Sequence, residues 1–436
     1  MRRSIGLALP AFLIIANLQA QKPTPPAVTT SGKLTEAPAE SVNMSTARLQ
    51  RIDGVVKEYI DKGKIPGGVG LVIRDGKIVY YRALGYDNKE EKTPLKRNAI
   101  YRIASQTKAI TSVAAMILYE EGKFLLDDPI SNYIHSFKNP QVLDKYNPAD
   151  TTYTTVPAKR QITIRDLLTH TSGIGYAQIG GKENNAIYAK NNLVSGLGAG
   201  KHVLAEDIQR LGSLPLMHNP GEKWTYGLNS DVLGYLVEVV SGMPLDKFLR
   251  TRIFDPLGMN DTWFFLPPAK QNRLVTLYVG DSTGKLQKAP EVIDQNGPMI
   301  TDYPKMEGTY FSGGAGLSST VYDYAVFLQM LLNGGVYDGK RILARNTVRM
   351  MTMNQIGDGL FGDNGFGLGF GVTSKKGSAK LPAQEGTFEW GGAYSTEYWV
   401  DPREKLVCLF YNQLWNADTD GLGEKFKVLV YQALTD

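Results

Sequence analysis

Residues 105–122 read Ser-Gln-Thr-Lys-Ala-Ile-Thr-Ser-Val-Ala-Ala-Met-Ile-Leu-Tyr-Glu-Glu-Gly. Apolar residues recur here with helical spacing up to Gly122, which predicts a buried helix with Ser105 at its N-terminus. Residues i and i+3 share a helix face, so the Lys108 amine can reach the Ser105 hydroxyl. Serine is a poor nucleophile until its proton is removed, and a neutral lysine can remove it. The stretch therefore predicts an active-site serine that needs neither metal nor histidine.

A second Ser-x-x-Lys match, Ser282 to Lys285, lies in a different context. A strand-like run at 274–279 precedes it and polar residues follow it, which indicates a hairpin turn. Gly280 to Gly284 also fits the G-x-S-x-G pattern of a nucleophile elbow, but an elbow passes directly into a helix and none starts here. These contexts favour Ser105. The alternative for Ser105 is a helix-capping serine beside a solvated lysine.

Length and charge narrow the class of protein. The chain has 436 residues, 42% of them hydrophobic, which is enough for one large domain or two interwoven ones. The net charge of +5 comes from scattered basic residues, so no nucleic-acid partner is expected. The single cysteine, Cys408, lies in an apolar run and is expected in a buried strand.

The first residues are typical of an export signal. Arg2 and Arg3 precede an apolar run over 5–16, and Ala20 is a suitable residue for cleavage, which predicts a signal peptide at 1–20 and a secreted or periplasmic bacterial protein. The run is short for a membrane span, so no stable membrane anchor is expected, with an uncleaved anchor as the alternative. Residues 21–46 are rich in Pro, Thr, Ser and Ala and predict a flexible linker.

Strand patterns lie near both ends of the remaining chain, and helical patterns lie between them. This arrangement predicts an α/β protein of the α+β type, with an antiparallel sheet made from both chain ends and flanked by helices. The catalytic domain is expected at 47–436, with a sheet subdomain at about 47–109 and 308–436 and an inserted, mostly helical subdomain at about 110–307. The expected helices are 44–62, 230–241, 321–332 and 423–434, and the expected strands are 67–73, 78–81, 365–372, 386–390, 395–400 and 406–412.

Two further segments carry candidate site residues. Tyr226 follows a Pro-Gly turn and leads into the helix near residue 230, where its phenol could shuttle a proton; the alternative is a half-buried tyrosine beside Trp224. Trp390-Gly391-Gly392-Ala393 reads as a strand edge, and paired glycines in a strand mark the close approach of a ligand or of another backbone. Such an edge can donate backbone N–H groups to an oxyanion. A bulge or a bend is the alternative.

These segments, in this order, resemble the motifs of the serine β-lactamase and penicillin-binding-protein superfamily. Ser105 and Lys108 match S-x-x-K, Tyr226 matches the tyrosine of Y-x-N, and Trp390-Gly391-Gly392 stands in place of K-T-G. The runs 167–173 and 313–319 agree as well. The likeness spans about 47–432 and is greatest to the class C-like branch, which includes family VIII carboxylesterases and D-stereospecific peptidases.

The resemblance implies a site and a mechanism. Ser105 would form an acyl-enzyme, and Lys108 and Tyr226 would share the role of general base. The backbone N–H groups of Ser105 and Ala393 would form the oxyanion hole. Trp390, Gly391, Gly392, Leu228 and Asn229 are expected to bind substrate.

The sequence departs from the superfamily pattern at two places. Leu228 stands two residues after Tyr226, so Asn229 comes one position late, and Trp390 replaces the lysine of the third motif. In β-lactamases that Lys and Asn help to hold the lactam, so these departures favour ester or D-peptide hydrolysis.

Four functions stay open at this point. An esterase comes first, then a D-amino-acid peptidase or carboxypeptidase on peptidoglycan peptides, a weak β-lactamase, and a non-catalytic sensor of cell-wall peptides. No cofactor and no metal are expected, since none of the four histidines forms H-E-x-x-H. His170 is expected to order a turn. The glycine-rich run 196–201 lacks the spacing of a phosphate loop.

Overall fold

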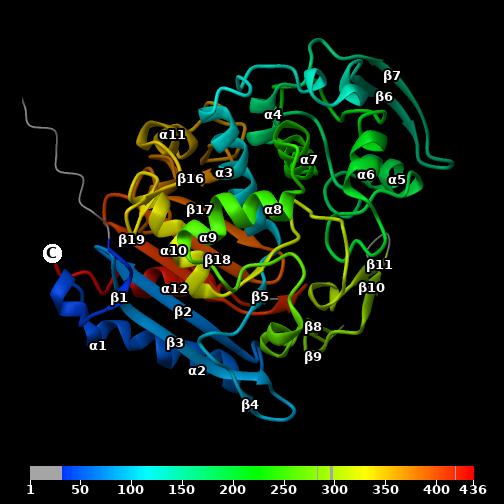
Figure 1. Cartoon of the computed structure of the whole chain (residues 1–436). Coiled ribbons are helices and arrows are strands. Elements are labelled where there is room, and N and C mark those ends of the chain that lie inside the picture. Colours follow the sequence, from blue (N-terminus) through cyan, green and yellow to red (C-terminus); the bar gives the residue numbers. More distant parts are fainter. Residues whose placement is uncertain (1–31, 282, 295–297, 418) are drawn as a thin grey trace, which may run out of the picture. The chain divides into compact units, whose positions relative to one another are not determined.

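A nine-stranded sheet joins the two ends of the chain in the computed structural model, which describes residues 32–281, 283–294, 298–417 and 419–436 (Figure 1). Its order is β1-β3-β2-β19-β18-β17-β16-β15, with β4 paired to β3. Neighbours run antiparallel except β1 and β3, which are parallel. The expected α/β fold is confirmed. The strands are β1 (Thr35–Glu36), β2 (Gly67–Arg74), β3 (Lys77–Asn88), β4 (Thr93–Pro94), β15 (Gly365–Phe366), β16 (Gly371–Val372), β17 (Phe388–Gly392), β18 (Thr396–Asp401) and β19 (Leu406–Tyr411).

Helices cover both faces of this sheet. On one face lie α1 (Thr46–Leu49), α2 (Arg51–Asp61) and α12 (Leu422–Tyr431), and α10 (Val321–Leu332) lies against β2, β18 and β19 on the other. Every residue of β2 is buried, as expected for a central strand with both faces covered. Asp75 and Gly76 join β2 to β3 with φ of 49° and 74°, the conformation that a tight hairpin turn requires.

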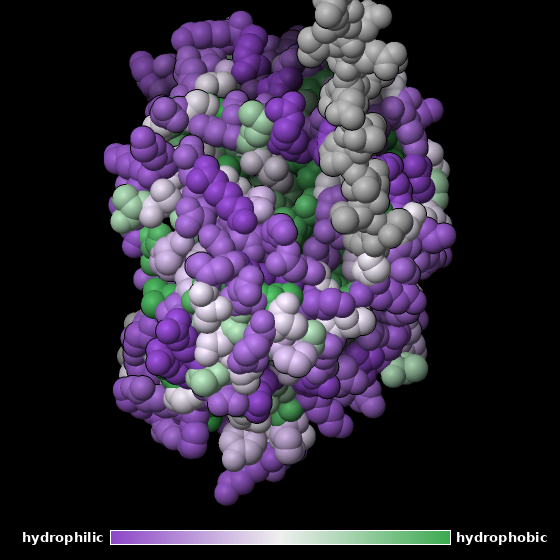
Figure 2. All heavy atoms as spheres, turned by 90° about the vertical axis from the view of Figure 1, so that its left-hand side faces the viewer, coloured by the Kyte–Doolittle hydropathy of each residue, from purple (hydrophilic) through white to green (hydrophobic). Residues whose placement is uncertain are grey.

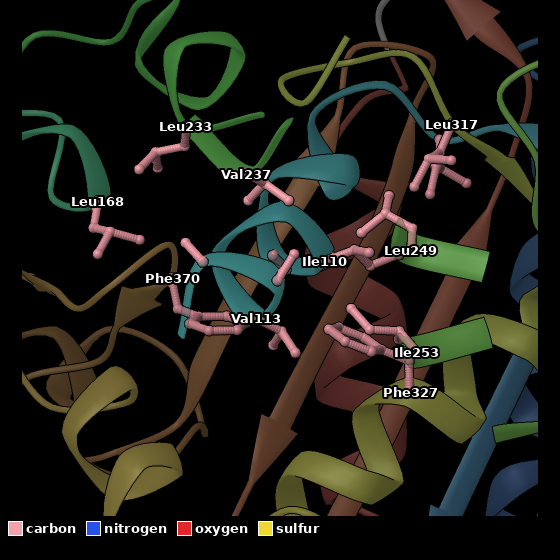
Figure 3. Close-up of a cluster of buried hydrophobic side chains, with 14 of the residues drawn as sticks. Ile110, Val113, Leu168, Leu233, Val237, Leu249, Ile253, Leu317, Phe327 and Phe370 are labelled. Atoms are coloured by element: carbon pink, nitrogen blue, oxygen red, sulfur yellow. The ribbon is translucent and has the colours of Figure 1, made fainter. Parts of the chain in front are cut away.

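The predicted helix after Ser105 forms the centre of the core. It is α3 (Thr107–Glu120), and every residue from Thr107 to Leu118 is buried. A helix that is buried all round must lie inside other layers. Figure 3 shows Ile110 and Val113 of α3 among side chains from the neighbouring elements, including Val237, Ile253 and Phe327.

The middle of the chain holds helices, as expected, but also strands. The helices of this region are α4 (Ile164–Leu168), α5 (Lys182–Lys190), α6 (Leu204–Leu211), α7 (Asn229–Ser241), α8 (Leu245–Leu249) and α9 (Asp255–Leu257), and α11 (Arg345–Met351) follows later. The hairpin of β6 (Gln141–Asn147) and β7 (Thr152–Pro157) was not expected, because β7 is exposed along its whole length and lacks the alternation of a half-buried strand.

Short strands complete the fold. The predicted hairpin turn around 280–284 is confirmed by the pairing of β8 (Tyr278–Gly280) with β9 (Leu286–Lys288). The remaining short strands are β5 (Tyr101–Arg102), β10 (Val292–Asp294), β11 (Pro298–Ile300), β12 (Ser318–Ser319), β13 (Val336–Tyr337), β14 (Lys340–Arg341) and β20 (Leu414–Trp415).

The predicted flexible linker at 21–46 is wrong for residues 32–46. There β1 pairs with β3, and Leu34, Ala39, Val42 and Met44 are buried. Each of these apolar side chains is isolated in the sequence and packs against the main body of the protein. Because polar residues surround them in the sequence, the composition of the segment did not indicate this burial. The predicted signal peptide at 1–20 and its cleavage near Ala20 lie outside the described residues.

Polar residues cover most of the surface seen from one side. The face shown in Figure 2 is mostly hydrophilic, with apolar residues scattered among polar ones. Within the described part of the chain, none of the helices combines the length and the apolar character needed to cross a bilayer.

Candidate active site

Ser105 lies in a tight turn at the start of α3. One turn of 3-10 helix (Ala104–Gln106) precedes the α-helix, so the predicted placement at a helix N-terminus is confirmed with a tighter first turn. Ala104 takes a positive φ of 41°, which costs energy for a residue with a Cβ. The Tyr324 hydroxyl donates to the Gln106 carbonyl at 2.8 Å and helps to fix the turn.

The Lys108 amine is buried beside Ser105. Its Nζ donates to Ser105 Oγ at 3.2 Å, to Tyr176 Oη at 2.9 Å and to the Gly314 carbonyl at 2.8 Å. The three oxygen atoms surround the amine nitrogen at hydrogen-bond distance. The Lys108 side chain is therefore held in one position against the serine.

Tyr226 approaches Ser105 from the other side. Its Oη lies 2.6 Å from Ser105 Oγ, and Lys108 Nζ lies 4.5 Å from the centre of its ring. The Tyr226 ring packs among four others, at centroid distances of 5.1 Å to His170, 5.4 Å to Tyr176, 5.7 Å to Trp390 and 5.8 Å to Trp224. The structure thus brings together the three residues predicted as catalytic and fixes the phenol by packing.

Two polar residues near Lys108 were not predicted from the sequence. Tyr176 accepts from Lys108, and Asp231 is a fully buried carboxyl that accepts a hydrogen bond from Ser312 Oγ at 2.5 Å. Burial raises the pKa of Asp231 to about 6, while the Ser312 hydrogen bond and the charge of Lys108 act in the opposite direction. A carboxylate in the first turn of an otherwise apolar helix is the signal that could have found Asp231.

The predicted role of Leu228 and Asn229 in substrate binding is wrong, because both side chains are buried in the interior, with 2% and 0% exposure. They lie at the start of α7, where Leu228 is the residue before the helix and Asn229 is its first residue. The Asn229 amide accepts from Ser172 Oγ and donates to His170 Nδ1 at 3.0 Å. Since that hydrogen bond occupies Nδ1 of His170 as an acceptor, a neutral ring carries its proton on Nε2.

His170 has a structural place next to the site. Its φ is 57°, and burial lowers its pKa well below the usual value, with a further contribution from the charge of Lys108. Among the described residues it makes no hydrogen bond to Ser105. Its ring instead contacts the Tyr226 ring, and its carbonyl accepts from the Thr225 N–H at 2.8 Å, which ties the turn at His170 to the segment before Tyr226.

The paired glycines mark the approach of another backbone. A Cβ on Gly392 would lie 2.3 Å from the Ile103 carbonyl oxygen, whereas a Cβ on Gly391 would meet only the Thr396 carbonyl at 3.3 Å. The end of β17 therefore lies directly against the turn that carries Ser105. Ala393 directly follows this strand, so its backbone lies close to that of Ser105.

A pocket of about 450 Å³ opens at these groups. Ser105, Tyr226 and Ala393 are among its lining residues. Its walls are the segment after Tyr176, strand β11 and Trp415, and most of these side chains are apolar. Trp390 does not line this pocket; its ring contacts Tyr226, Phe361 and Phe366.

The comparison with known protein families agrees with this geometry. The family model described as Beta-lactamase matches residues 52–429. The chain belongs to the beta-lactamase family. Members of this family are serine hydrolases. The resemblance to the superfamily implied this fold and this order of the site segments.

Family relatives differ in activity. Esterase EstB of Burkholderia gladioli is 30% identical over 396 residues, which cover 88% of this chain and 94% of EstB. A putative D-alanyl-D-alanine carboxypeptidase of Escherichia coli O157:H7 is 29% identical over 400 residues, which cover 86% of this chain and 84% of that protein. The solved structure of EstCE1, a hydrolase with promiscuous acyltransferase activity, aligns with a TM-score of 0.76 at 27% identity and covers 88% of this chain and 99% of EstCE1.

Proposed function

We propose that this beta-lactamase-family hydrolase cleaves carboxylic esters through an acyl-enzyme on Ser105. The observation that supports it most is the position of Ser105 Oγ, which lies within hydrogen-bond distance of both Lys108 Nζ and Tyr226 Oη. A nucleophile flanked by two groups that can take and return its proton is the arrangement that covalent acyl transfer requires.

The first half-reaction forms the acyl-enzyme. Ser105 Oγ bonds to the ester carbonyl carbon while its proton passes to the Lys108–Tyr226 pair. The carbonyl oxygen becomes an oxyanion that accepts from the N–H groups of Ser105 and Ala393; losing one such donor costs roughly 10²–10³ in rate. The bond to the alcohol oxygen then breaks, and the alcohol leaves with the proton that the pair returns.

The second half-reaction restores the enzyme. A water molecule takes the place of the alcohol and loses its proton to the same pair. Its oxygen bonds to the acyl carbon, the bond to Ser105 Oγ breaks, and Ser105 regains a proton. The products are the alcohol and the carboxylic acid.

The surroundings of Trp390 favour esters over D-Ala-D-Ala peptides. The ring contacts of Trp390 within the described residues are all aromatic: Trp224, Tyr226, Phe361 and Phe366. A peptide whose leaving group carries a terminal carboxylate needs a cation or several donors as its partner. At this position, where the superfamily pattern has a lysine, Trp390 and its aromatic neighbours supply no cation.

A D-amino-acid carboxypeptidase is the second candidate, because the Escherichia coli O157:H7 relative carries that description. A weak β-lactamase and a non-catalytic sensor of cell-wall peptides follow. The sensor is disfavoured by a complete Ser105, Lys108 and Tyr226 cluster with hydrogen-bond geometry.

Turnover of matched substrates separates these candidates. Purified protein is tested with p-nitrophenyl butyrate, a D-Ala-D-Ala peptide and a chromogenic cephalosporin. The variant Ser105→Ala is assayed with the same substrates. The control is Ser282→Ala, which alters the second Ser-x-x-Lys match. We expect ester hydrolysis that Ser105→Ala abolishes and Ser282→Ala retains. Faster cleavage of the peptide would favour the carboxypeptidase, and penicillin binding without turnover of any substrate would favour the sensor.

We also propose that the protein is exported. Support comes from the charged and apolar pattern of its first twenty residues. Amino-terminal sequencing of protein recovered from the periplasm or the medium is expected to begin after Ala20. Recovery of uncut protein from the cytoplasm alone would contradict export.

A further inference from the structure

The pocket beside Ser105 has an unbalanced charge. Of the described residues that line it, none is Asp or Glu, while Lys201 and His202 lie side by side in its wall. Lys201 is exposed and forms no ion pair within the described part of the chain. The pocket therefore combines an apolar interior with one unpaired cation.

The neighbouring acid does not cancel this charge. Asp207 lies outside the lining, and its carboxylate already contacts His202 Nδ1 at 2.9 Å and Arg210 at 3.2 Å. A negative group that enters the pocket would thus meet Lys201 without competition from a lining carboxylate. A cationic group would meet repulsion, since like charges in a site of reduced dielectric are unfavourable.

Glycines set the path of the wall that carries Lys201. Gly196, Gly198 and Gly200 all have positive φ, and a Cβ on Gly198 would lie 2.4 Å from the backbone nitrogen of Ile300. The run that superficially resembled a phosphate loop in the sequence is instead a segment seated directly on β11. This seating fixes the course of the backbone that leads to Lys201 beside the pocket.

We propose that this pocket binds an acyl chain whose far end carries a negative charge, with Lys201 as its partner. The proposal rests on the ester hydrolysis proposed above and names its substrate class: esters of dicarboxylic acids, or of acids with a comparable anionic end. The chain's methylene groups lie along the apolar wall, and the terminal carboxylate lies at Lys201.

Two matched esters test the proposal. Mono-p-nitrophenyl adipate carries a charged acyl end, and p-nitrophenyl hexanoate has the same chain length without the charge. We expect kcat/KM for the adipate to be about five-fold higher in the wild type, the size that a partly exposed ion pair supports. The preference should vanish in Lys201→Ala, reverse in Lys201→Glu and weaken at high salt. Lys182→Glu, on the exposed start of α5 and outside the pocket, is the control with an equal change of charge.

Other outcomes separate the inference from the proposed function. Equal turnover of the two esters, or a preference that survives Lys201→Glu, would overturn the anionic acyl class while leaving ester hydrolysis intact. A Lys201-dependent preference for 4-carboxyphenyl hexanoate, whose charge is in the alcohol part, would overturn the assignment of the pocket to the acyl chain. Failure of the wild type to hydrolyse any of these esters would overturn the proposed function, and the inference with it.

Discussion

Tyr226 Oη and Ser105 Oγ lie 2.6 Å apart, although 121 residues separate them in the sequence. The contact forms because the Tyr226 ring packs against Trp390 of β17, and the tight turn before α3 lies against the same strand. Since the Tyr226 ring is packed on several sides, the oxygen–oxygen contact is set by the fold and not by a mobile side chain.

Tyr226→Phe removes this contact and leaves the ring packing. We expect kcat for p-nitrophenyl butyrate to fall by roughly 10²–10³, the range for loss of a general acid–base group, with little change in KM. Steady-state kinetics measure the effect, and an unchanged melting temperature shows that the fold is retained. A decrease of less than five-fold would remove Tyr226 from the proton pathway.

Tyr176→Phe tests the second tyrosine against the first. It removes one of the three acceptors of Lys108 without touching Ser105. We expect kcat to fall by about ten-fold, because lost positioning costs less than a lost proton-transfer group. If Tyr176→Phe proved as damaging as Tyr226→Phe, the two phenols would have to exchange roles.

Gly392→Ala and Gly391→Ala form a matched pair in β17. The Cβ at 392 would lie 2.3 Å from the Ile103 carbonyl, whereas at 391 the nearest backbone atom is 3.3 Å away. Gly392→Ala should therefore displace Ala393, lower the melting temperature and reduce kcat by about 10² or more, as for a lost oxyanion donor. Gly391→Ala should stay within a few-fold of wild type, and equal effects of the two substitutions would contradict the close approach.

Asp231→Asn tests the buried carboxyl through stability. The pKa of Asp231 is raised to about 6, so the folded state binds a proton more tightly than the unfolded state. This contribution to stability is present at about pH 4 and is lost as the pH rises through 6, by up to roughly 3 kcal/mol.

The variant lacks this titration, so its stability relative to wild type should increase from pH 4.5 to 7.5. Urea or thermal unfolding at the two pH values measures the difference, in which the other titrating groups largely cancel. A difference that is constant or that runs in the opposite direction would show that Asp231 is ionised throughout.

The sequence predicted the parts of the site that have strong local patterns. Ser105 and Lys108 were found from the periodicity of one helix, and Tyr226 and Ala393 from their places in the order of motifs. The hairpin of β2 and β3 was equally accessible, because Asp75-Gly76 between two apolar runs is a strong turn signal.

Features that depend on tertiary contacts were missed. Tyr176 contributes a single hydroxyl from an irregular loop, and nothing in its neighbours reveals that Lys108 lies beside it. Asn229 looked like a displaced substrate ligand, but its amide is consumed by Ser172 and His170 in the interior. The burial of Leu34, Ala39, Val42 and Met44 likewise depends on surfaces made by distant segments.

Mass spectrometry of the acyl-enzyme tests the central claim most directly. Protein is mixed with p-nitrophenyl butyrate, quenched in acid within the burst, and its intact mass and peptides are measured. We predict one added butyryl group, located on the peptide that contains Ser105 and absent from Ser105→Ala. An adduct on another residue, or ester hydrolysis that persists in Ser105→Ala, would contradict the account.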